Sequence, residues 1–171
     1  MMSRLCTLFE RLLEFVVLVL MVTLAAEITL GVIYRTLGLS LVWYDEIASV
    51  LLAWLTYYAA ALAALKRAHI GVPGLVQALP RRFRLPLVVL AEALVFAFFL
   101  LLAWVGWGVM DMLATDFLIS LPNISSKYTQ SVIPIGAVLF IIAQALNLPE
   151  TLRAARAGHI KHQAEAVEIN Q

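Results

Sequence analysis

The sequence predicts an all-α integral membrane protein with four transmembrane helices and with both termini in the cytoplasm. Hydrophobic residues make up 63% of the 171 residues, charged residues only 13%, and the mean hydropathy is +0.95. So few polar side chains cannot cover a water-facing surface. Four long apolar runs and a strongly uneven distribution of Lys and Arg supply the other two indications.

Each apolar run has the length that a bilayer requires, about 20 residues at roughly 1.5 Å per residue. Pro86 and Pro149 are expected to mark the start of the third helix and the end of the fourth, and Ser125 or Ser126 to cap the fourth. All four belong to one membrane domain over residues 1–171. The expected spans and tail are residues 12–34, 46–65, 87–110, 128–148 and, in the cytoplasm, 149–171.

The basic residues predict the orientation of the spans. Ten Lys and Arg residues lie before the first span, between the second and third, or after the fourth, whereas only Arg35 and Lys127 lie in the other two connections. Both termini and the middle connection are therefore expected in the cytoplasm. The first run carries Glu27 and continues into Arg35, so it is interpreted as an uncleaved anchor and not as a signal peptide.

Glu27 is the acidic residue that lies well inside the first span. An ionised carboxylate there costs about 2.5–3.5 kcal/mol, and the fourteen Leu, Val, Ile and Phe residues between Leu12 and Tyr34 offset it with about 6 kcal/mol. At helical spacing Thr23, Glu27, Gly31 and Tyr34 share one face, which is expected to turn toward protein. Two interpretations remain open: a buried carboxylate bonded to a neighbouring helix or partner, or a proton or ion site.

The second span has marked boundaries. Arg35, Trp43, Asp45 and Glu46 precede it, and Lys66, Arg67 and His69 follow it. Trp favours the headgroup layer, carboxylates suit a helix N-terminus and cations suit a helix C-terminus. Its Ala-rich end, residues 59–64, is either a close-packed helix contact or ordinary helix filler.

Three further features concern the third and fourth spans. Glu92 is expected to pair with a cation of the middle connection, such as Arg82, Arg84 or Lys66. Trp104 and Trp107 are expected to form an interfacial belt. Pro134 and Gly136 are candidates for a bend in the fourth helix.

The sequence lacks the motifs of several functional classes. Cys6 is the single cysteine, and the sequence has no His inside a span, no Walker loop, no HExxH and no nucleophile elbow. The charge balance of +1 also excludes a basic nucleic-acid binder. We therefore expect no enzyme, no cofactor and no metal, and favour a transport or accessory role.

Taken together, these residues resemble the small membrane subunit, of the DctQ type, of tripartite ATP-independent periplasmic (TRAP) transporters. The resemblance covers roughly residues 10–148 and rests on Arg35, the Trp43-Tyr44-Asp45-Glu46 boundary, Trp54, the Lys66-Arg67-Ala68-His69-Ile70 exit and the Ile133-Pro134-Ile135-Gly136 stretch. The family often has Gly in the stretch after the second-span Trp, where this chain has Ala59 and Ala60.

The resemblance implies a subunit of a secondary transporter in a bacterial inner membrane. Its partners would be a large multi-span subunit, a periplasmic receptor that delivers an organic acid, and the lipids. Uptake would follow an ion gradient, with sodium as the expected ion, while the small subunit braces the large one. Arg35, Trp43 and Glu46 would lie at the periplasmic boundary and His69 at the cytoplasmic one.

Two other functions remain open at this point. Some small four-helix exporters carry one essential Glu in their first helix, so a self-sufficient proton-coupled exporter would use Glu27. The length of the chain and its fixed orientation disfavour that alternative. A structural or assembly protein unrelated to transport is the third possibility, and co-purification with a large multi-span partner would distinguish it.

Overall fold

A computed structural model describes residues 2–39, 41–66 and 81–157. Two helices precede residues 67–80, which the structure does not describe: α1 (Met2–Thr36) and α2 (Tyr44–Leu65). After it come α4 (Arg81–Val109), the short 3-10 helix η1 (Met112–Thr115), α5 (Ser126–Gln130) and α6 (Val132–Ala157). Four helical stretches are long and apolar enough to cross a membrane: Cys6–Thr36, Tyr44–Leu65, Phe83–Val109 and Ser126–Arg153.

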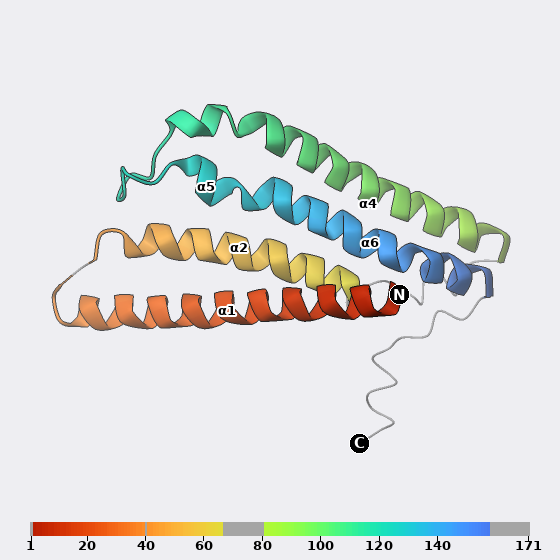
Figure 1. Ribbon diagram of the computed structural model, residues 1–171, viewed down its shortest axis with the longest axis horizontal. Helices are drawn as coiled ribbons and strands as arrows, with labels where there is room; N and C mark the ends of the chain where they lie inside the picture. Colours follow the sequence, from red (N-terminus) through yellow and green to blue (C-terminus); the bar gives the residue numbers. More distant parts are fainter. Residues whose placement is uncertain (1, 40, 67–80, 158–171) are drawn as a thin grey trace, which may run out of the picture.

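The four long helices lie side by side in the order α1, α2, α6, α4 (Figure 1). The start of α1 and the end of α6 lie at one end of the row, which we call the Lys66 end. The connection from α1 to α2 and the segment from η1 to α5 lie at the opposite end, which we call the Trp43 end. This up-and-down order agrees with the four spans expected from the sequence.

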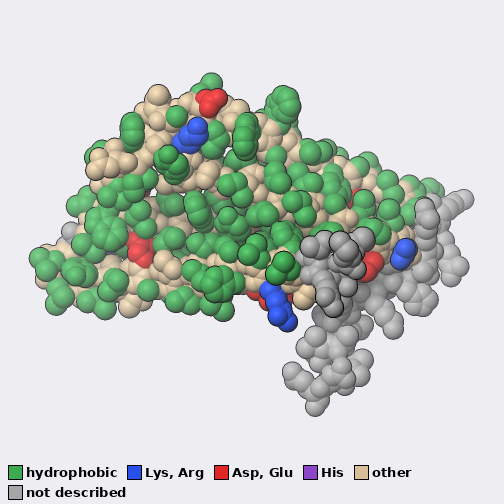
Figure 2. All heavy atoms as spheres, in the orientation of Figure 1, with side chains coloured by type: hydrophobic (Ala, Val, Ile, Leu, Met, Phe, Trp, Pro, Cys, Tyr) green, Lys and Arg blue, Asp and Glu red, His purple; other side chains and the backbone are tan. Residues whose placement is uncertain are grey.

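The helices bury little of their apolar surface against one another. Only ten hydrophobic side chains among the described residues are buried, while most of the visible face is covered by hydrophobic side chains (Figure 2). In water this exposure would be unfavourable, but in a bilayer these side chains face lipid or another membrane protein. The exposed surface therefore supports the membrane assignment independently of helix length.

A small core lies toward the Lys66 end. Leu13 of α1 meets Ala61 and Ala64 of α2, with Phe140 and Ala143 of α6 in the same cluster. The small Ala side chains let the helix backbones approach closely, so the Ala-rich end of α2 is a packing contact and not filler. Phe99 of α4 stacks on Phe140 with ring centroids 3.7 Å apart.

Polar contacts join the helices around this core. The Asn147 side-chain amide donates to the backbone oxygens of Ala64 and Leu65 at 2.8 and 2.9 Å, so it satisfies carbonyl groups at the end of α2. The Gln144 amide donates to Glu92 at 2.6 Å. Lys66 turns instead to Glu14 and Glu10 of α1, so the expected pairing of Glu92 with Lys66 is wrong.

The expected helix boundaries at the two prolines are also wrong, because Pro86 lies inside α4 and Pro149 inside α6. A proline removes one backbone hydrogen bond, and a helix packed in a membrane tolerates that loss where neighbouring groups satisfy the freed carbonyl. Ser125 does cap the fourth span, since its hydroxyl accepts a hydrogen bond from the Lys127 N–H of α5 at 3.3 Å.

The face of α1 that contacts α2 differs in part from the expected one. Glu27 and Gly31 lie on it, but Thr23 and Tyr34 are exposed. From Leu13 onward, one series of buried or half-buried positions of α1 alternates spacings of four and three residues, as in the seam of two helices that coil around each other. These positions are Leu13, Val17, Leu20, Leu24, Glu27 and Gly31.

Candidate functional site at the Trp43 end

Glu46, in the first turn of α2, organises the segment that connects α4 to α5. Its two carboxylate oxygens accept hydrogen bonds from the backbone N–H groups of Ile119 and Ser120, at 2.9 and 2.8 Å. The Ser120 hydroxyl in turn donates to the Val42 backbone oxygen at 3.2 Å. Hydrogen bonds to a charged acceptor are stronger than neutral ones, so Glu46 fixes this segment against the start of α2.

Trp54 makes a second connection, one that reaches α5. Its indole N–H donates to the backbone oxygen of Thr129 at 2.7 Å. That carbonyl belongs to the last turn of a short helix, where backbone oxygens lack their usual helical partners. Glu46 and Trp54 therefore hold two successive parts of the chain, the connection and α5, against the same side of α2.

Pro134 explains why α5 ends where it does. It has no N–H to donate to the Gln130 oxygen, and its ring crowds that same carbonyl group one turn earlier. The fourth span is therefore interrupted at Ser131, before Pro134, while a bend there stays a prediction. Pro134 itself is buried, and Gly106 of α4 lies against it: a Cβ atom at Gly106 would be 3.3 Å from the proline Cδ.

The other predicted boundary residues cluster at the same end. Arg35 lies in the last turn of α1, and Trp43 is the residue that immediately precedes α2. Asp45 is exposed in the first turn of α2, and its backbone oxygen accepts a hydrogen bond from the Ser49 hydroxyl at 2.7 Å. His69 lies outside the described residues.

Glu27 lies deeper in the contact between α1 and α2. Both of its carboxylate oxygens are buried and have no hydrogen-bond partner among the described residues. One turn further along α1, the ring of Tyr44 packs directly on Gly31, where a Cβ atom would overlap it. The described residues therefore bury the carboxylate oxygens without supplying a bond from a neighbouring helix, and a bond from a partner protein stays a prediction.

Three contacts could not be recognised from their residue types. Ser120 gives no motif, and the roles of Gln144 and Asn147 depend on which helix neighbours α6. Gly136 allows α6 to approach α2 closely, since a Cβ atom there would lie 2.7 Å from the Cβ of Tyr57. The only available signal was the presence of small or amide side chains inside an apolar run.

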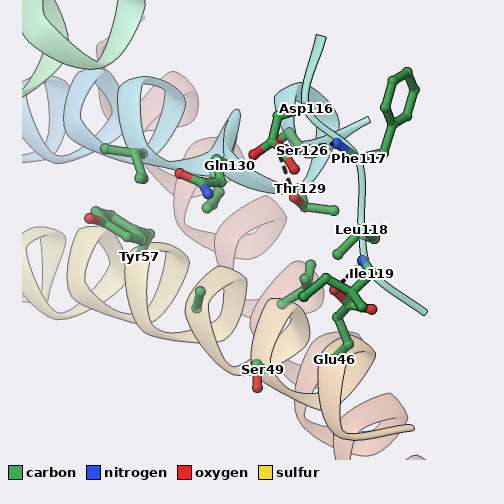
Figure 3. A pocket seen from close by; sticks show the side chains of 14 residues that line it. Glu46, Ser49, Tyr57, Asp116, Phe117, Leu118, Ile119, Ser126, Thr129 and Gln130 are labelled. Carbon is green, nitrogen blue, oxygen red and sulfur yellow. Dashed lines mark hydrogen bonds between the residues drawn. The ribbon is translucent and has the colours of Figure 1, made fainter. Parts of the chain in front are cut away.

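Between α2 and the start of the fourth span, formed by α5 and the first turn of α6, lies an open groove of about 510 Å³, which residues 116–119 border at the Trp43 end (Figure 3). Glu46, Tyr57, Asp116 and Gln130 line it together with apolar side chains. In the part of the chain that the structure describes, no group of three or more His, Cys, Asp or Glu side chains could hold a metal ion. The described polar groups of this end connect segments of the chain.

Four apolar helices in an open row, joined by part-buried polar contacts, are typical of a subunit of a membrane assembly. The chain matches the family model for tripartite ATP-independent periplasmic transporters, DctQ component, over residues 24–154. It therefore belongs to this family, and it is a small membrane subunit of a TRAP transporter in the inner membrane. A search of curated proteins gives no match.

Proposed function

We propose that this subunit braces the large transport subunit during ion-gradient-driven uptake of an organic acid that a periplasmic receptor delivers. The observation that carries the proposal is the open row of helices, in which exposed apolar side chains of all four long helices remain available to lipid or to another membrane protein. A helix row with so small a core gains stability by packing laterally on a larger partner.

The internal contacts suit a rigid support. Glu46 and Trp54 fix the Trp43 end, while Asn147 and the Lys66 pairs fix the opposite end. Each of them joins different helices or a helix and a connection, so the row resists shear at both of its ends. A moving subunit needs such a fixed surface to move against.

We also propose the orientation and the coupling. The Lys66 end carries the excess of basic residues and would lie in the cytoplasm, so the Trp43 end would face the periplasm and the receptor. Sodium is the proposed coupling ion, with its site in the large subunit. A reporter fusion within residues 70–85 should report the cytoplasm, and a periplasmic signal would contradict this orientation.

Uptake measurements test the bracing role directly. Vesicles that contain the large subunit and this chain should accumulate the substrate when receptor and an inward sodium gradient are supplied. Vesicles without this chain should lose at least about ten-fold in initial rate at equal amounts of large subunit. Full uptake by the large subunit and receptor alone would contradict the proposal, as would flux through this chain alone.

A further inference from the structure

The groove between α2 and α6 differs from the other membrane-level surfaces of the chain. Along α4 the exposed side chains are apolar and many are large, among them Leu94, Phe98 and Leu101. The groove instead has small and apolar side chains such as Val50, Ala53 and Ile133. Polar side chains are interspersed with them, from Glu46 at the Trp43 end to Tyr57 and Gln130 at the other (Figure 3). A surface hollowed in this way favours close packing of another helix over contact with fluid lipid.

The mouth of the groove carries a definite charge. Glu46 and Asp116 are the two charged residues that line it, and both are acidic. The Glu46 carboxylate is fixed by the Ile119 and Ser120 N–H groups, and Asp116 accepts a bond from the Phe117 N–H at 3.2 Å. Lys127, the nearby cation in the sequence, is directed to Asp111, 3.8 Å away.

The negative charge of Glu46 and Asp116 favours some occupants of the groove over others. Two carboxylates repel the phosphate of a phospholipid headgroup and attract a Lys or Arg side chain. Apart from residues 116–119, the lining belongs to two membrane-spanning segments, so an occupant that fills the groove lies at membrane depth with its cation at the boundary. A transmembrane helix with a basic residue near its end satisfies both requirements.

We propose that this groove receives one transmembrane helix of the large transport subunit, and that a Lys or Arg at the end of that helix pairs with Glu46 and Asp116. The inference rests on the proposed bracing function and specifies the surface through which it acts. The faces of α1 and α4 that point away from the row then contact lipid.

Retention of the large subunit on affinity-tagged variants of this chain tests the groove. Ala53→Trp fills it, whereas Ala97→Trp adds the same bulk on the exposed face of α4. Ala53 is itself exposed, so the new ring has room on the isolated chain. We expect Ala53→Trp to lower the retained large subunit at least about ten-fold and Ala97→Trp to leave it unchanged.

A charge reversal tests the mouth of the groove. Asp116→Lys should lower retention at least about five-fold, while Asp111→Lys, at the same end but outside the groove, should have a smaller effect. Retention at the wild-type level in Ala53→Trp overturns the helix occupant, and retention in Asp116→Lys overturns the proposed cation.

Two outcomes separate this inference from the function on which it depends. If the wild-type chain fails to retain the large subunit, the bracing function itself is overturned. If Ala53→Trp retains the large subunit but loses bound phospholipid, measured by phosphate analysis of the purified complex, the groove is a lipid site and only the present inference fails.

Discussion

The Trp54 indole donates a hydrogen bond of 2.7 Å to the backbone oxygen of Thr129, although the two residues are 75 positions apart in the sequence. The bond exists because two local features coincide. A Trp points from the middle of α2, and a helix break near Pro134 leaves a carbonyl group on α5 in need of a donor. This contact between α2 and the fourth span therefore depends on the interruption between α5 and α6.

Replacing Trp54 by Phe should destabilise the chain by about 1–2 kcal/mol, because the Thr129 oxygen would lose its donor in a part-buried position. Thermal unfolding in a mild detergent measures the change. Trp104→Phe is the matched control, since Trp104 is 82% exposed on α4. Equal shifts for the two variants would contradict a specific role for the Trp54 bond.

Replacing Gly136 or Gly108 by Ala should change the stability of the chain in opposite directions. Gly136→Ala should destabilise the chain by about 1–3 kcal/mol, because the added methyl group would meet Tyr57 at a distance that real Cβ atoms do not adopt. Gly108→Ala should stabilise α4 by about 0.5–1 kcal/mol, since its Cβ would meet no atom within 4 Å. Denaturant unfolding compares both with wild type, and a stabilised Gly136→Ala would show that α2 and α6 are not in close contact.

Much of this architecture could be predicted from the sequence, and the errors have physical causes. The positions of the four spans follow from composition and length, which do not depend on tertiary contacts. Pro86 and Pro149 misled because their cost in a helix depends on which neighbours satisfy the freed carbonyl groups. The contacting face of α1 was only half correct: Glu27 and Gly31 lie on it, but Leu24 takes the place expected for Thr23, and Tyr34 near the end of the helix is exposed.

The site was predicted less completely than the spans. Trp43, Asp45 and Glu46 were recognised as a boundary, but the partners of Glu46 are backbone groups, which no residue pattern reveals. The same holds for Trp54. Interhelical partners such as Gln144 and Glu92 require the order α1, α2, α6, α4, and hydropathy alone does not determine that order.

Lys66 should give the chain a stability contribution that disappears at high pH. Its hydrogen bond to the Glu14 carboxylate, the largest influence, raises the pKa of Lys66 above the ordinary value of 10.5. A raised pKa in the folded state means that the contribution is complete below about pH 10.5 and is lost as the pH rises through the higher value. The pair is partly exposed, so its size is about 0.2–1 kcal/mol.

Unfolding of wild type and Lys66→Met between pH 7 and pH 11.5 measures this contribution. The difference between the two proteins should stay constant up to about pH 10 and then shrink. Arg11→Met removes an exposed cation of α1 at the same end, and its effect should not change over this range because Arg stays protonated. A Lys66 difference that grows with pH would contradict the assignment.

Glu27 separates the bracing role from a self-sufficient proton-coupled exporter. Both of its oxygens are buried without a hydrogen-bond partner, so the described residues give the carboxyl group no proton relay to join. Gln has nearly the same shape and cannot titrate. In the assembled transporter, Glu27→Gln should therefore keep initial uptake within about two-fold of wild type, with the same dependence on pH between 6 and 8. Proton coupling through Glu27 would instead make the amide variant inactive, and a loss of about ten-fold or more at unchanged complex assembly would show that this carboxyl group titrates during transport.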